Sequence, residues 1–219
     1  MLKAVLFDMD GVIVDTEPLH HKAYYNMFDQ IGIDVSDSLY RSFTGQSTIN
    51  ICKKICDRFG LKYTPEELVQ IKRDYFTTLF FEDDGLQLIE GVKDLIQDYY
   101  TNGLTLILAS SASMFTINNV MNRFELDSFF SEKLSGADLK ASKPHPEIFI
   151  NAAAAAHALP SECIVIEDST NGIIAAHEAE IFCIAYKSEN SKNQDYSLAN
   201  SVISNFDEIK FQKIKTILD

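Results

Sequence analysis

Two aspartates stand one residue apart near the start of the chain, directly after an apolar run. Residues 3–7 are followed by Asp8, Met9, Asp10 and Gly11. A strand that ends in acids is typical of an open α/β sheet, in which ligands bind beyond the carboxyl ends of the strands. Burying two adjacent carboxylates is costly without a cation or a shared proton, and Mg²⁺ prefers such oxygen ligands. The alternative is an Asx-Gly turn in which Asp10 only shapes the loop.

Two serines follow the next apolar run, residues 105–109. Ser110 and Ser111 offer hydroxyl and backbone N–H groups at a helix start, which suits an anion such as phosphate. The competing interpretation is that Ser111 or Ser113 is simply the N-cap of the following helix. A cap and an anion site can coexist, so both interpretations stay open.

Two more acids, Glu167 and Asp168, follow the apolar run at residues 163–166. They can cap the next helix, but four carboxylates that converge on one sheet edge favour a bound cation. Lys143 lies in a loop with prolines at 144 and 146. A loop lysine is usually solvated, whereas one positioned by prolines is a candidate for a fixed positive charge.

Alternating strand and helix patterns predict an α/β fold with a doubly wound parallel sheet. The apolar runs are continuous, which indicates strands buried on both faces. The expected strands are residues 3–8, 105–109, 163–166, 182–185 and 201–203. The expected helices around them are residues 91–102, 113–124, 146–158, 171–179 and 208–218.

Residues 16–87 interrupt this alternation and are predicted to be helical throughout. The expected helices are residues 17–31, 36–42, 47–59 and 64–80. The last has a well-marked start, with Thr64 as N-cap, Pro65 at the first helical position and Glu67 completing a capping box. Such a block is too large for a simple crossover. We therefore expect an inserted helical-bundle cap domain at 16–87 and a core formed by 1–15 and 88–219, with hinges near 12–16 and 82–90.

The composition restricts the possible partners. A net charge of −13 makes nucleic acid an unlikely partner, because binding to a phosphate backbone requires a basic face. A small phosphorylated metabolite stays possible, since a metal and one or two lysines can reverse the local field. We find no leader and no apolar run near the roughly 20 residues of a membrane helix, so we expect no membrane association and a cytoplasmic location. The four cysteines are expected to be reduced and structural, and a monomer is the default expectation.

Four segments together resemble the haloacid dehalogenase-like superfamily, specifically its phosphatase and phosphomutase branch with a small helical cap. They are residues 7–17, 108–111, 142–149 and 166–169, which occur in the family's order and spacing. The resemblance implies a Rossmann-like core and catalysis through an aspartyl-phosphate. It makes Asp8 the nucleophile and Asp10 the general acid and then base. Family members that dehalogenate or cleave phosphorus–carbon bonds lack that second aspartate, so the chain is similar to a phosphate-ester enzyme.

The same resemblance implies the binding groups. Ser110, Ser111 and Lys143 would bind the transferring phosphoryl group, and Lys143 would offset the charge on Asp8. Mg²⁺ would be held by Asp8, by Asp168 and by the backbone carbonyl of Asp10, with Glu167 close by. Positioning and charge neutralisation supply most of the catalysis in phosphoryl transfer, which agrees with this set of groups.

The resemblance also separates a hydrolase from a mutase. β-Phosphoglucomutase resembles this chain but has an arginine where Thr48 stands, and polar residues where Ala112, Ser113 and Met114 follow the two serines. Without that guanidinium a second phosphate loses a bidentate ligand, so we favour hydrolysis of a small phosphorylated metabolite, and a sugar phosphate is the class we expect.

Three further expectations complete the sequence-based hypothesis. His20 matches a histidine of the mutase, which keeps isomerisation open, and it can equally be an ordinary helix histidine. Gly45, Gln46 and Thr48 are candidate substrate contacts. An inert binding or regulatory protein is the third and remotest alternative, because the acids, Ser110 and Lys143 are all retained.

Overall fold

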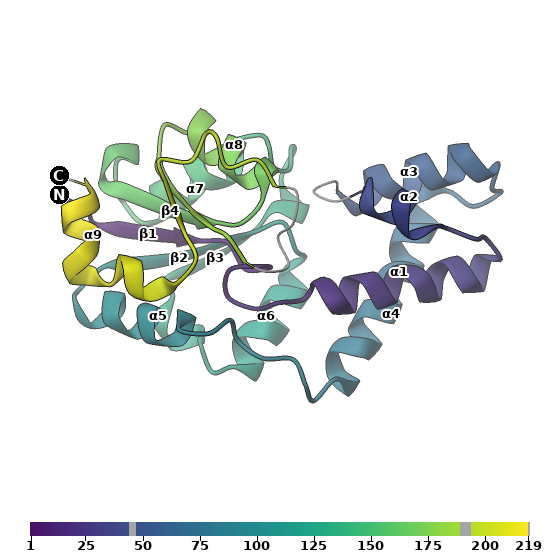
Figure 1. The fold of residues 1–219 in the computed structure, drawn as a ribbon, viewed down its shortest axis with the longest axis horizontal. Helices are drawn as coiled ribbons and strands as arrows, with labels where there is room; N and C mark the ends of the chain where they lie inside the picture. The colour runs from purple at the N-terminus through teal and green to yellow at the C-terminus, as the bar shows by residue number, and fades with distance from the viewer. Residues whose placement is uncertain (44–46, 189–193, 219) are drawn as a thin grey trace. The chain divides into compact units, whose positions relative to one another are not determined.

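Six parallel strands form one sheet in the order β3-β2-β1-β4-β5-β6, as the computed structural model shows for residues 1–43, 47–188 and 194–218 (Figure 1). The strands are β1 (Ala4–Phe7), β2 (Thr105–Ser110), β3 (Glu132–Ser135), β4 (Cys163–Glu167), β5 (Phe182–Tyr186) and β6 (Ser201–Ile203). This confirms the predicted doubly wound sheet. The strand order reverses between β1 and β4, and such a switch point is where open α/β sheets bind their ligands.

Helices cover both faces of this sheet. In Figure 1, α7 (Glu147–Ala155) and α8 (Thr170–Glu178) lie on one face, with α5 (Val92–Thr101) and α6 (Met114–Arg123) on the other. Strand β1 packs against helices on both faces of the sheet. Leu6 belongs to the core cluster that includes Phe149 of α7, and the ring of Phe7 lies 6.4 Å from that of Tyr99 in α5. This double burial explains why the run is apolar without alternation.

The register between β1 and β4 determines where Asp8 and Glu167 lie at the edge of the sheet. Phe7 pairs with Ile166 of β4, and the backbone N–H of Asp8 donates to the Ile166 carbonyl at 3.0 Å. Asp8 and Glu167 therefore leave the sheet side by side, at the carboxyl ends of two neighbouring parallel strands.

The sequence-based prediction was incomplete at the sheet edge and wrong at the C-terminus. It missed β3, a short edge strand whose sequence, EKLS, has three charged or polar residues and one apolar residue. It also joined residues 208–218 into one helix. The structure instead has a 3₁₀ turn at Phe206–Ile209 and then α9 (Phe211–Leu218), because the extended ψ of 153° at Lys210 interrupts the helix between them.

Residues 16–86 form a compact unit of their own, separate from the unit made by residues 1–15 and 87–219. Its helices are α1 (Glu17–Ile31), α2 (Asp37–Arg41), α3 (Thr48–Phe59) and α4 (Pro65–Glu82), and α4 packs against both α1 and α3. The predicted capping box is confirmed: the Glu67 N–H donates to Thr64 Oγ1 at 3.2 Å, and the Thr64 N–H donates to Glu67 Oε2 at 2.7 Å. Helix α4 runs two residues further than predicted.

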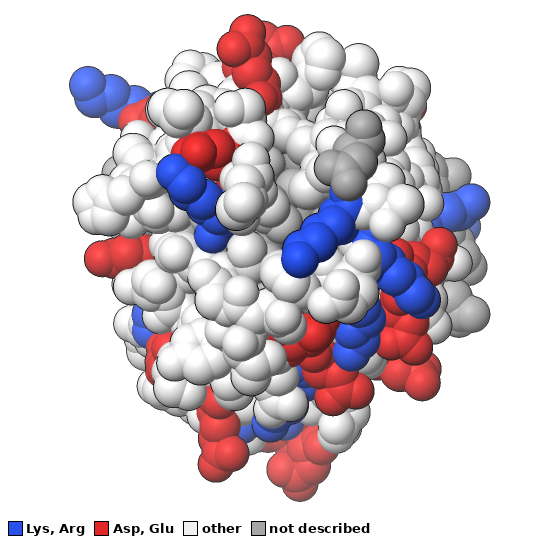
Figure 2. Space-filling model, turned by 90° about the vertical axis from the view of Figure 1, so that its left-hand side faces the viewer, with Lys and Arg blue, Asp and Glu red and all other residues white. Residues whose placement is uncertain are grey.

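Surface charge is mixed on the face over α9 and the start of β1. Figure 2 shows lysine and arginine side chains beside acidic ones on this face, without a continuous basic surface. None of the helices in the described part of the chain is both long and apolar enough to cross a membrane.

Candidate active site

The Asp8 carboxylate is buried and paired with a lysine from a distant part of the chain. Its Oδ1 lies 2.5 Å from Lys143 Nζ, although 135 residues separate the two. Burial raises the pKa of Asp8 from 3.8 to about 8; Lys143 opposes this increase, and the charges of Glu167 and Asp10 add to it. A cation beside this carboxylate would oppose the effect of burial and favour its ionised form.

Lys143 is a fixed cation and not a solvated loop residue. Its ammonium donates to Asp8 Oδ1, to Glu167 Oε1 at 2.8 Å and to the carbonyl of Ala109 at 2.9 Å, which uses all three of its protons. Burial alone disfavours the charge, but the two facing carboxylates outweigh this and raise the pKa of Lys143. The candidate fixed charge at position 143 is thus present in the structure.

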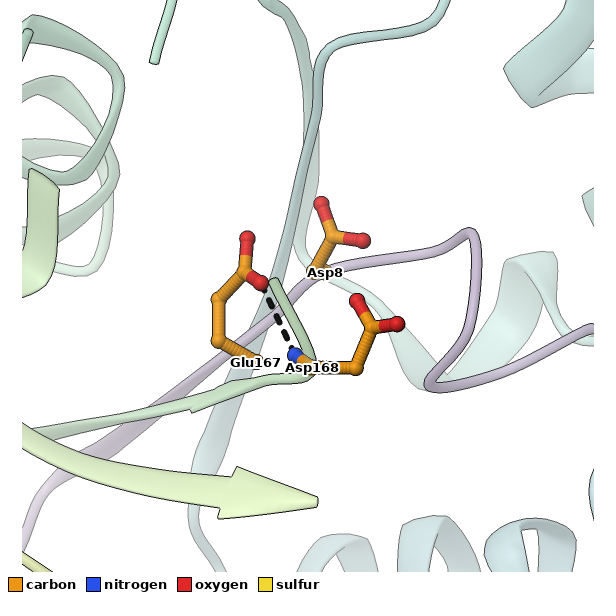
Figure 3. Close-up of side chains that lie close together, drawn as sticks. All are labelled: Asp8, Glu167 and Asp168. Atoms are coloured by element: carbon orange, nitrogen blue, oxygen red, sulfur yellow. Dashed lines mark hydrogen bonds between the residues drawn. The ribbon is translucent and has the colours of Figure 1, made fainter. Parts of the chain in front are cut away.

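Three carboxylates meet at the switch point of the sheet. Asp8, Glu167 and Asp168 each have an oxygen within 4.8 Å of the others (Figure 3). Glu167 is held on one side by Lys143; its Oε2 accepts from the N–H groups of Asp168 and Ser169, both at 2.8 Å, and from Ser169 Oγ at 3.0 Å. Asp8 follows β1 and Asp168 follows β4, and their carboxylates turn toward the same space in Figure 3.

This set of donors fits a hard divalent cation. The group holds three carboxylates, and the ammonium of Lys143 is paired with two of them, Asp8 and Glu167. Burial, and then the charges of Glu167 and Asp10, raise the pKa of Asp8, and a cation would oppose both effects. In phosphoryl-transfer enzymes Mg²⁺ is typically bound through one or two carboxylates together with substrate phosphate oxygens. Asp8, Glu167 and Asp168 are accordingly the residues that could hold the metal.

Two glycines permit the acids to approach the backbone closely. A Cβ on Gly11, whose φ is +85°, would lie 2.2 Å from Asp168 Oδ2. A Cβ on Gly172 would lie 1.8 Å from Glu167 Oε1. The role of Gly172 was missed at the sequence level, where this residue only fell within the helix expected at 171–179.

We predict that Gly172→Ala displaces Glu167 and weakens Mg²⁺ binding by roughly tenfold or more, since the partners that orient metal ligands contribute effects of this size. Isothermal titration calorimetry of the folded variant measures this change. Gly85→Ala is the matched control, because its Cβ would meet only Asp83 Oδ1, at 3.0 Å. Wild-type affinity in Gly172→Ala would contradict the prediction.

Asp10 lies in a tight turn beside this group. The Met9 carbonyl accepts from the N–H groups of Ile13 and Val14, at 2.8 and 3.1 Å, and the Gly11 N–H donates to the Val14 carbonyl at 2.8 Å. Asp10 is half-buried and its charge contributes to the raised pKa of Asp8, yet its carboxylate is not one of the three that converge. Of the two aspartates in the opening motif, Asp8 thus belongs to the group of three carboxylates and Asp10 does not.

The serines after β2 have different environments. Ser110 is fully buried and its Oγ accepts from the Ala112 N–H at 3.0 Å, whereas Ser111 is exposed. The N-cap of α6 is Ser113, whose side chain accepts from the Thr116 N–H. Ser111 is therefore not the cap, and the role of Ser110 and Ser111 in phosphate binding stays a prediction.

Comparison with known proteins places this site in a family. Residues 5–186 match the haloacid dehalogenase-like hydrolases. The chain belongs to this family. It is 27% identical over 207 residues to hexitol phosphatase B of Escherichia coli K12, covering 94% of this chain and 93% of that protein. It is 29% identical over 188 residues to β-phosphoglucomutase of Bacillus subtilis, covering 84% and 82%.

A solved structure agrees with this assignment. β-Phosphoglucomutase from Clostridium difficile superposes with a TM-score of 0.84 at 28% identity, covering all of this chain and 97% of its own. The resemblance inferred from the four motifs is thus confirmed. The chain is a haloacid dehalogenase-like enzyme whose relatives are phosphatases and phosphomutases.

The helical unit of this haloacid dehalogenase-like enzyme contains a part-buried polar pair. His20 Nδ1 lies 2.6 Å from Lys72 Nζ, and the His20 ring stacks on Phe76 with the centroids 4.3 Å apart. Burial, and then the charge of Lys72, lower the pKa of His20, so its neutral ring accepts from the ammonium. Lys72 was missed, although Leu68 and Phe76, four residues away on either side, place it on the buried face of α4.

Of the other predicted substrate contacts, Thr48 lies in the described part of the chain. The Thr48 side chain hydrogen-bonds to the buried Tyr24 hydroxyl. Gly45 and Gln46 lie outside the described residues.

Proposed function

We propose that the protein is a Mg²⁺-dependent phosphatase that hydrolyses a small phosphorylated metabolite, a sugar phosphate, through an aspartyl-phosphate at Asp8. The observation that carries the proposal is the pairing of Asp8 with Lys143 at 2.5 Å inside a group of three carboxylates at the switch point. A carboxylate beside a fixed ammonium is suited to accept a phosphoryl group, because the cation offsets the repulsion between the two anions.

The proposed reaction has two steps. In the first, an Asp8 oxygen bonds to phosphorus, and the bond to the leaving oxygen breaks as Asp10 gives that oxygen a proton. In the second, Asp10 takes a proton from the attacking water, and the aspartyl-phosphate is hydrolysed to free Asp8 and phosphate. In both steps the ammonium of Lys143 offsets the negative charge at Asp8. Asp8, Asp168 and the backbone carbonyl of Asp10 would hold Mg²⁺, with Glu167 close by. When bound, the metal would neutralise charge on the phosphoryl oxygens.

Hydrolysis is favoured over isomerisation by the residue at position 48. Threonine has no cationic head for a second phosphate, and its side chain hydrogen-bonds to Tyr24. The similarity to hexitol phosphatase B supports the same choice.

One observation favours a second candidate, a phosphomutase. Lys72 is a buried cation in the helical unit, beside neutral His20, and an ammonium is suited to a second phosphate group. The similarity to β-phosphoglucomutase of Bacillus subtilis agrees with this alternative.

Phosphate release from a panel of sugar phosphates in Mg²⁺ separates these candidates. We expect steady release of inorganic phosphate. Conversion of β-glucose 1-phosphate to glucose 6-phosphate with little free phosphate would establish the mutase instead. If neither reaction occurs with any phosphorylated metabolite, an inert regulatory protein becomes the better description.

A further inference from the structure

The loop that carries Asp168 is tied to a segment 24 residues further along the chain. Gln194 Oε1 accepts from the Thr170 N–H at 2.7 Å and from Thr170 Oγ1 at 2.8 Å. Thr170 Oγ1 in turn accepts from the Asp195 N–H at 2.8 Å. These three hydrogen bonds, which we call the Gln194 bridge, have no part in the reaction as described above.

The Gln194 bridge completes the support of this loop from its far side. On the near side, Glu167 Oε2 accepts from the N–H groups of Asp168 and Ser169. On the far side, the Ser169 side chain accepts from the Gly172 N–H at 3.1 Å, and Gln194 takes the N–H of Thr170. Asp168 is therefore held between Glu167 before it and the Gln194 bridge after it.

The chemistry of the amide suits this position. The first N–H groups of a helix need acceptors, and α8 begins at Thr170. A carboxylate would supply such an acceptor but would add a negative charge beside three others. The amide oxygen of Gln194 satisfies the backbone without adding charge.

The segment that supplies Gln194 is itself anchored. Asp195 Oδ1 accepts from the Ser197 N–H at 2.9 Å. The backbone N–H of Asn200 donates to the Cys183 carbonyl of β5 at 2.9 Å, and Asn200 Oδ1 also accepts from the Cys183 N–H at 2.8 Å. The bridge thus connects the Asp168 loop to a strand of the sheet, which gives the loop a rigid reference.

We infer that Gln194 is a positioning residue, which fixes the Asp168 loop through Thr170 so that Asp168 is preorganised to bind the divalent cation. This inference rests on the proposed function, because it concerns the metal site proposed there. Partners that orient metal ligands typically contribute 10- to 100-fold in metal affinity.

The test is Mg²⁺ binding by isothermal titration calorimetry in the absence of substrate. We expect Gln194→Met, which keeps the chain length but loses the amide oxygen, to raise the dissociation constant for Mg²⁺ by about tenfold. At saturating Mg²⁺, kcat should recover to within about twofold of the wild type, because Gln194 contacts no reacting group. Gln194→Glu retains an acceptor oxygen and should bind Mg²⁺ at least as tightly as the wild type.

Asn200→Ala is the matched control. It removes a side-chain hydrogen bond of the same kind from the same segment, but that bond goes to β5 and not to the Asp168 loop, and the backbone bond that anchors the segment to β5 is kept. It should lower the melting temperature and leave the dissociation constant for Mg²⁺ unchanged. A folded Gln194→Met with wild-type Mg²⁺ affinity, or an equal loss of affinity in Asn200→Ala, would overturn the inference.

Amide hydrogen exchange separates a failure of this inference from a failure of the proposed function. If the wild type binds no Mg²⁺, the proposed metal site is wrong. The Gln194 bridge is then still tested by exchange in the peptide that spans residues 168–170. Faster exchange in Gln194→Met than in Asn200→Ala supports the positioning of the loop, and equal exchange overturns it.

Discussion

Asp8→Asn should abolish turnover of every phosphorylated substrate, with a loss on the order of a thousandfold or more, as expected for removal of an attacking nucleophile. The amide is nearly the same size as the carboxylate, so the fold should persist. An amide is a poor nucleophile and cannot carry the phosphoryl group. Steady-state phosphate release measures the loss. Mass spectrometry of the acid-quenched wild-type protein should show a phosphoryl adduct at Asp8 that the variant lacks.

The same substitution should stabilise the protein when divalent cations are removed. The pKa of Asp8 is raised from 3.8 to about 8 in the folded state, chiefly by burial, so the ionised carboxylate opposes folding. Below pH 3.8, the pKa of Asp8 in the unfolded state, the variant and the wild type should have the same free energy of unfolding. Above it, the variant should be the more stable of the two. The difference should grow as pH rises toward about 8 and then stay constant. Thermal unfolding in a chelator, measured across this range, gives the comparison.

Two results would contradict this account of Asp8. One is substantial turnover by a folded Asp8→Asn. The other is a variant that is less stable than the wild type above pH 8 in chelator, which would show that the ion pair with Lys143 outweighs the burial of charge. Asp29→Asn, at an exposed position of α1, is the matched control and should leave the activity unchanged.

The sequence was sufficient to predict the acids of the candidate site because their placement follows from topology. A continuous apolar run predicts a buried parallel strand, and parallel strands deliver the residues after them to one edge. Asp8 after β1 and Glu167 at the end of β4 meet for this reason. The doubly wound sheet and the helices that cover it could be predicted in the same way, because their periodicity is local.

The features that the sequence did not reveal depend on contacts between distant segments. The family resemblance implied that Lys143 lies near Asp8, but nothing local to residue 143 indicates that its ammonium also donates to Glu167 and to the Ala109 carbonyl. The bond between Gln194 and Thr170 is equally invisible, because a glutamine in a polar segment is ordinarily solvated. Strand β3 was missed because an edge strand need not be apolar.

Asp10→Ala should separate proton transfer from metal binding. The Asp10 carboxylate lies outside the group formed by Asp8, Glu167 and Asp168, so its removal should leave the dissociation constant for Mg²⁺ within about twofold of the wild type. Turnover of a sugar phosphate should fall by roughly 10²- to 10⁴-fold, the usual contribution of a general acid or base. Calorimetry and phosphate release measure the two quantities on the same preparation.

The leaving group provides a sharper form of this experiment. The nitrophenolate released from p-nitrophenyl phosphate is weakly basic and leaves without a proton, so the first step should be spared in Asp10→Ala. Activation of water still needs the missing base, so the aspartyl-phosphate should accumulate. We expect a burst of nitrophenol stoichiometric with enzyme, followed by slow turnover, and no burst in Asp8→Asn. An equal loss with both substrates and no burst, or the loss of Mg²⁺ binding in folded Asp10→Ala, would show that Asp10 supports the site and does not move the protons.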